Sequence, residues 1–154
     1  NRASMYDTWG DKHQLYMAAL KRYRQGSSSW LLEKIRSEVP ARKIIEDFMF
    51  NAVEEAINDP ERKGCFLVNA ATELCNQDPQ VHQLFIDNKK ILVQVLSELI
   101  KEAQSRGEIR QDKSPEVIAS FLYTTLVGLR VISKSENPDR ELKEVVQLAL
   151  STLS

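Results

Sequence analysis

Three pairs of residues, each an acceptor side chain followed by proline, divide this sequence into helical segments. The pairs are Asp78-Pro79, Ser114-Pro115 and Asn137-Pro138. The first side chain of such a pair can accept hydrogen bonds from the free amides of a helix start, and proline has its φ preset for the first turn. Apolar residues follow each pair at helical spacing, and no alternating strand pattern of useful length is present. We therefore predict an all-α fold.

The same signals give approximate helix bounds. We expect helices from Pro40 to near Asn58, over residues 64–75, from Pro79 to about Ser105, from Pro115 to about Ser133, and after Pro138. Gly107 is expected to end the third of these with a left-handed residue. Residues 64–75 carry Glu73 as their only charge, so this helix is expected to be buried nearly all round.

Length and charge restrict the domain organisation. A chain of 154 residues, 42% apolar and 28% charged, has enough apolar residues for one good core, or for one core and a remnant of a second domain. The net charge of −1 argues against a surface that is basic all over. Residues 1–25, however, hold five lysines and arginines against two aspartates, and the remainder is acidic. This asymmetry suits a small phosphate-facing end on a non-binding body.

No apolar run reads as long enough to span a bilayer, and no signal peptide is visible, so we expect no membrane partner and a cytoplasmic protein. Cys65 and Cys75 are the only cysteines. If both lie on one helix, the rise of about 15 Å between them is too large for a disulfide.

Residues 1–23 read as a short helix, a Gly10-Asp11 turn and a second helix. Together with the run Gly-Cys-Phe-Leu-Val-Asn-Ala-Ala-Thr-Glu-Leu at residues 64–74 and two apolar final helices, this segment resembles the TetR/AcrR family of bacterial transcriptional repressors. The resemblance covers the whole chain. Because a helix-turn-helix needs an earlier helix to brace its recognition helix, the resemblance implies that the first helices of the DNA-binding domain are missing from this chain.

The resemblance implies an all-helical homodimer that binds a double-stranded operator and a small-molecule inducer. Residues 1–25 would be the back part of the DNA-binding domain, and residues 26–154 the ligand-binding and dimerisation domain. Tyr6 and Lys12 match the family's phosphate-contacting positions. Arg2, Ala3 and Ser4 lie where side chains of the recognition helix can reach base edges.

A polar strip predicts the ligand site. On residues 65–76, one side of the helix carries Cys65, Asn69, Thr72 and Asn76. Asn88 likewise interrupts the apolar stripe of the next helix. Buried polar groups need partners, which a wet pocket would supply. Apolar walls are expected from Phe48, Met49, Phe85 and Tyr123. The alternative is that Asn69 and Thr72 bond to neighbouring backbone and that the aromatic residues are plain core.

The final two helices are too apolar to be covered by one small core. Set beside the same pair from a second subunit, they predict a four-helix dimer interface. Its expected residues are Phe121, Leu122, Leu126, Gly128, Leu129, Val145, Val146 and Ala149. The alternative is that both helices simply fill the core of the single chain.

Other functions are weighed against a DNA-binding regulator. With two histidines and no nucleotide-binding, metalloprotease or nucleophile-elbow motif, we expect no enzyme, no metal and no cofactor. One alternative is a helical dimeric protein that binds a metabolite or protein without DNA. Another is a redox or electrophile sensor at Cys65, which follows Gly64 near a helix N-terminus, where thiolate is favoured.

Overall fold

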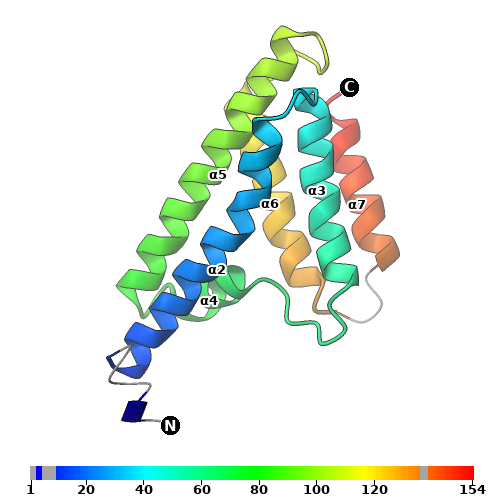
Figure 1. The fold of residues 1–154 in the computed structure, drawn as a ribbon. Coiled ribbons are helices and arrows are strands. Elements are labelled where there is room, and N and C mark those ends of the chain that lie inside the picture. The colour runs from blue at the N-terminus through cyan, green and yellow to red at the C-terminus, as the bar shows by residue number, and fades with distance from the viewer. Residues whose placement is uncertain (1–2, 5–9, 136–138) are drawn as a thin grey trace.

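A computed structural model describes residues 3–4, 10–135 and 139–154, and within these ranges the chain is helical with no strand. The helices are α2 (Lys12–Ile35), α3 (Ala41–Ile57), α4 (Phe66–Leu74), α5 (Pro79–Ser105), α6 (Pro115–Ile132) and α7 (Asp139–Ser151). The all-α prediction is confirmed. The long helices α2 and α5 lie along one side of the molecule, α3 and α7 along the other, and α6 lies between them (Figure 1). The short α4 packs where α2 and α5 begin (Figure 1).

The predicted helix starts are confirmed where the structure describes them. Asp78 accepts hydrogen bonds from the amides of Gln80 (2.9 Å) and Val81 (3.2 Å), and thereby caps α5. The Ser114 hydroxyl accepts from the Val117 amide at 3.2 Å and caps α6. The third pair, Asn137-Pro138, lies outside the described residues, and α7 begins at the next position. Gly107 follows α5 with a φ of 69°, as its left-handed role requires.

Helix α2 is longer than expected. It continues past residue 25, through Gly26 and the serines after it, to Ile35. Packing explains this extension, because the helix is held at both ends. Met17 and Leu20 are buried against α4 and α5, whereas Leu31 is buried in the main core. The two predicted domains are therefore joined by one continuous helix, and their division at residue 25 stays a prediction.

Burial corrects one expectation for α4. Leu67, Val68 and Ala70 are its buried residues, whereas Thr72 and Glu73 are exposed. The helix is thus covered on one side by α2, α5 and α6 rather than all round. The low charge of this helix does not mean that it is fully buried. Its uncharged polar residues Asn69 and Thr72 lie near the surface and form hydrogen bonds to nearby backbone carbonyls.

Helix α6 corrects a second expectation. By length and composition alone, α6 could cross a bilayer, and it is the one helix among the described residues that could. We had expected no apolar run of that length. A core helix of a globular domain meets the same criterion. One third of α6 is buried inside the molecule, and it packs against α3, α4, α5 and α7.

The described residues form two apolar clusters. The main cluster joins α3, α5, α6 and α7, with Ile45, Leu96 and Leu122 fully buried at its centre. A smaller cluster joins the first half of α2 to α4 and the start of α5, around Leu20 and Val81. This division matters for function, because the space between two clusters is where a small molecule can be held.

Candidate functional site

A cavity of about 210 Å³ lies between the two apolar clusters. Helices α2, α3, α5 and α6 and the start of α4 all contribute to its wall. Its apolar lining is Leu31, Leu32, Phe48, Leu67, Val68, Phe85, Ile91, Leu92, Val95, Leu126 and Val127, and its polar lining is Tyr23, Cys65, Asn88, Tyr123 and Arg130. An apolar wall with a few polar groups is the usual composition of a small-molecule site.

Two tyrosines and a cysteine form the polar end of this cavity. Burial, followed by the nearby Cys65, raises the pKa of Tyr23 to about 12. The positive charge of Arg130 and, after it, the Phe66 backbone oppose the rise in the pKa of Tyr23. Burial and Cys65 likewise raise the pKa of Tyr123 to about 12. Both phenols are therefore neutral hydrogen-bonding groups at physiological pH.

Arg130 is the only charged residue of the cavity wall. Its Nη2 donates to Glu55 Oε2 at 2.6 Å, and its side chain is 18% exposed. The glutamate approaches from α3, outside the lining residues, so the positive charge is already paired. The wall therefore offers no free charge to a ligand.

A tight loop brings Cys65 to the cavity. Gly64 has a φ of 68°, and its amide donates to Asp59 Oδ2 at 3.0 Å. A Cβ at Gly64 would lie 3.1 Å from the Arg130 carbonyl oxygen and 3.2 Å from Lys134 Cγ. Glycine is thus required both by the left-handed backbone and by the close approach to the end of α6.

Five of the eight predicted ligand residues line the cavity: Phe48, Cys65, Phe85, Asn88 and Tyr123. Met49 does not, because it is fully buried in the main core. The Asn69 amide donates to the Lys63 carbonyl at 2.7 Å, and its oxygen accepts from Lys134 at 3.1 Å. The Thr72 hydroxyl donates to the Val68 carbonyl at 3.1 Å. For these last two residues the alternative of local hydrogen bonding describes the structure.

Sequence reasoning missed Tyr23 and Arg130. Tyr23 lies on α2, eleven residues beyond Lys12, in the segment read only as the end of the DNA-binding domain. Arg130 had a visible signal, because it is the only charge between Val117 and Ile132. A single charge in an apolar helix needs a partner or a function.

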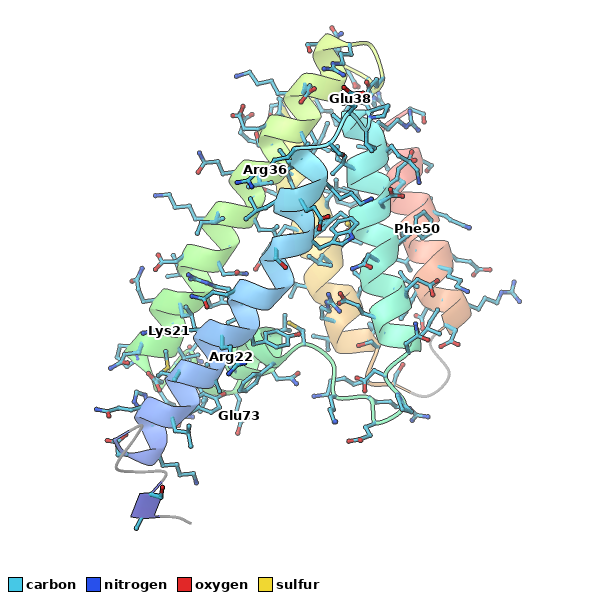
Figure 2. The ribbon with its side chains drawn as sticks, viewed as in Figure 1. Lys21, Arg22, Arg36, Glu38, Phe50 and Glu73 are labelled. Atoms are coloured by element: carbon cyan, nitrogen blue, oxygen red, sulfur yellow. The ribbon has the colours of Figure 1, made fainter. Side chains whose placement is uncertain are left out.

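The predicted DNA-facing residues are described only in part. Ala3 and Ser4 are helical and exposed, and Lys12 is exposed at the first position of α2. Arg2 and Tyr6 lie outside the described residues. Further basic side chains lie along the same half of α2, where Figure 2 shows Lys21 and Arg22, both exposed.

A direct contact links this end of α2 to the cavity helices. His13 Nε2 lies 2.7 Å from Asp78 Oδ2. The other oxygen of Asp78 caps α5, whose later residues line the cavity. Although desolvation opposes it, hydrogen bonds from His13 and from the Val81 and Gln80 amides lower the pKa of Asp78.

An apolar surface runs along α6 and α7. Its exposed members are Val117, Phe121, Val131, Ile132, Val145 and Leu148, and Leu148 is 71% exposed. We call these six residues the α6–α7 face. Of the predicted interface residues, Phe121, Gly128 and Val145 are exposed. The structure buries Leu122, Leu126, Leu129, Val146 and Ala149 in the core of the single chain.

Gly128 has open space around it. A Cβ there would meet no atom of the described residues within 4 Å, so no helix crossing among them requires this glycine. In the part of the chain that the structure describes, no group of three or more His, Cys, Asp or Glu residues is placed to hold a metal ion. Cys65 and Cys75 are both free thiols, as their spacing predicted.

The chain is similar to known proteins in sequence. Residues 42–149 match the family of tetracyclin repressor-like C-terminal domains. The HTH-type transcriptional regulator YezE of Bacillus subtilis (strain 168), itself uncharacterised, is 29% identical over 154 residues, which are 99% of this chain and 79% of that protein.

Two solved structures share the fold. Both are cysteine variants of CifR, a TetR family transcriptional regulator, in complex with 26-bp double-strand operator DNA. The first has a TM-score of 0.84 at 24% identity and covers all of this chain and 81% of CifR. The second has a TM-score of 0.84 at 23% identity and covers 99% of this chain and 79% of CifR.

Proposed function

Because this chain belongs to the TetR family of transcriptional regulators, we propose that it is a ligand-responsive DNA-binding regulator. In this proposal a small molecule in the cavity releases a dimer from a pseudo-palindromic operator, so that the protein acts as a repressor. The observation that carries the proposal is that one helix, α2, begins at Lys12, the predicted phosphate contact, and lines the cavity with Tyr23, Leu31 and Leu32.

The geometry of α2 supports a direct coupling. Lys12 and Tyr23 are separated by a helical rise of about 16 Å. A rigid helix transmits a shift at one end to the other, and the His13–Asp78 contact adds a second link between the DNA-facing end and α5. A coupling free energy of about 1–3 kcal/mol is enough for such a response.

Dimerisation through the α6–α7 face completes the proposal. Single exposed apolar residues are normal on a protein surface, but this face has six of them on two adjacent helices. A patch of this kind is typical of an interface. A two-fold axis through this face would give a four-helix interface and would carry two DNA-binding ends to successive major grooves. The cytoplasm is the compartment where such a protein meets DNA, and no enzymatic activity and no membrane partner are part of the proposal.

The DNA-binding proposal is tested by fluorescence anisotropy. The intact protein is titrated onto DNA that flanks its own gene, with a scrambled duplex as competitor, at two salt concentrations. Specific binding that survives the competitor supports the regulator. Binding that is equal for both duplexes and lost with salt is electrostatic only, and it would favour the helical binding protein that does not use DNA.

A second candidate function, a thiol sensor, is favoured by the place of Cys65 in the cavity wall. A small oxidant or electrophile that enters the cavity would meet this thiol. Cys75 is the internal reference, because burial raises the pKa of its thiol and so disfavours its reactive thiolate. Mass spectrometry after mild peroxide should find Cys65 modified before Cys75, and an unmodified Cys65 would end this candidate.

A further inference from the structure

The chemistry of the cavity wall identifies the class of molecule that it binds. We propose that the ligand is a compact, uncharged molecule with an apolar body and one hydrogen-bond acceptor, and that the Tyr123 hydroxyl donates to this acceptor. This inference rests on the proposed function, because it takes the cavity as the regulatory site.

The cavity has the size of a compact ligand. A cavity of about 150 Å³ lined by leucine, isoleucine and phenylalanine holds benzene. The cavity here is about 210 Å³ and is lined on several sides by side chains of the same kind, among them Phe48, Phe85 and Leu92. One ring with a short substituent therefore fits, and it buries its carbon atoms against apolar walls.

The charges of the wall exclude an ionic ligand. Among the lining residues there is no carboxylate, so a cation would lose its hydration without gaining a partner. The only cationic group, Arg130, already donates to Glu55 at 2.6 Å. An anion at Arg130 would share this cation with the Glu55 carboxylate, whose like charge opposes it.

The acceptor is inferred from two polar groups that lack partners. The described residues provide no hydrogen bond to the Tyr123 hydroxyl, which belongs to a residue only 6% exposed, or to the Asn88 side-chain amide. Tyr23 differs, because it interacts with the Cys65 side chain and the Phe66 backbone. Among the described residues no fully buried side-chain nitrogen or oxygen lacks a partner, so both polar groups reach the open space of the cavity. A ligand acceptor satisfies the Tyr123 hydroxyl, and Asn88 gives a second donor.

A groove between α2 and α5 gives the ligand its route. The groove shares Leu32, Ile91 and Val95 with the cavity wall, and it continues toward Ile35. Leu32 is 50% exposed and Ile91 is 55% exposed, so these side chains are free to turn outward without breaking a packed core.

Isothermal titration calorimetry of the intact protein tests the ligand class with four single-ring probes of similar size. Acetophenone carries a neutral acceptor, ethylbenzene lacks one, benzoate is an anion and benzylamine is a cation. We expect acetophenone to bind about tenfold more tightly than ethylbenzene, since it adds one neutral hydrogen bond. Benzoate and benzylamine should bind more weakly than either.

Tyr123→Phe isolates the hydroxyl. The variant should lose the advantage of acetophenone while its affinity for ethylbenzene is unchanged. It should also fold normally, because the removed hydroxyl has no hydrogen-bond partner among the described residues. Tyr16→Phe is the matched control, since Tyr16 lies outside the cavity wall, and it should leave all four affinities unchanged.

Three results would overturn the inference: no detectable binding of acetophenone, equal affinity for acetophenone and ethylbenzene, or tighter binding of an ionic probe. DNA anisotropy on the same preparation separates this failure from failure of the proposed function. Operator binding without acetophenone binding removes the ligand class alone. Acetophenone binding without operator binding removes the regulator and leaves the ligand class standing.

Discussion

Leu148→Ala is expected to weaken the dimer strongly. Leu148 is 71% exposed on α7, the largest exposed fraction among the apolar residues of the α6–α7 face. Truncation removes about three methylene groups, worth about 0.8 kcal/mol each when buried. If the partner covers the exposed fraction, each copy loses about 1.7 kcal/mol of transfer free energy. A two-fold interface holds the residue twice, so the loss is about 3.4 kcal/mol and the dimer Kd rises about 300-fold.

Sedimentation equilibrium over a concentration series measures this Kd. Ile86→Ala is the matched control, because Ile86 is also an exposed apolar residue (41%) but lies on α5, away from the α6–α7 face. The control should dimerise like the unchanged protein. The reasoning is refuted if Leu148→Ala leaves the dimer Kd unchanged, or if Ile86→Ala weakens the dimer as much.

Three further predictions concern other parts of the molecule. Lys12→Ala in the intact protein should weaken binding to operator and scrambled DNA alike and lower the salt slope by about 1, because one phosphate contact is lost; anisotropy at several salt concentrations measures this. Gly64→Ala should lower the free energy of unfolding by about 1–3 kcal/mol, since it places a Cβ on a left-handed backbone against α6, and thermal unfolding measures this. Tyr23 and Tyr123 have folded-state pKa values raised to about 12. Their contribution to stability is therefore complete below the ordinary phenol pKa of about 10 and is lost as the pH rises from there to about 12. Ultraviolet titration should show late phenolate transitions that Tyr23→Phe and Tyr123→Phe remove.

Each of these has a control. Lys101→Ala, at the far end of α5, should leave DNA binding unchanged, and a change of sequence preference in Lys12→Ala would contradict the phosphate assignment. Gly107→Ala should cost stability through its backbone alone, because a Cβ there meets no atom within 4 Å. The assignment is wrong if the double variant Tyr23→Phe/Tyr123→Phe keeps every late transition of the unchanged protein; Tyr16, whose pKa burial also raises, remains in that variant.

Local chemistry explains what could be predicted of the fold. The starts of α5 and α6 follow from Asp78 and Ser114, whose side chains cap the helix amides within three residues along the chain. The extension of α2 beyond Gly26 could not be predicted in this way. It depends on Leu31, which contacts helices that are distant in the sequence.

The cavity was predicted less completely, for a related reason. A helical projection placed Cys65, Asn69 and Thr72 on one side, but it could not show that Asn69 would bond to Lys63 and Lys134 instead of a ligand. The sequence of α6 is apolar on more than one side of the helix. The pattern therefore could not show which side faces the core. Tyr23 and Arg130 become parts of the wall only when α2 and α6 are packed against α4 and α5.

The central claim is that the cavity and the DNA-binding end are thermodynamically linked. The most direct measurement is the Kd of the intact protein for its operator fragment, without and with saturating acetophenone. The account predicts that the ligand raises this Kd by about 5- to 150-fold, and that bound operator weakens acetophenone binding by the same factor. A Kd for DNA that is independent of a ligand shown by calorimetry to occupy the cavity would contradict the account.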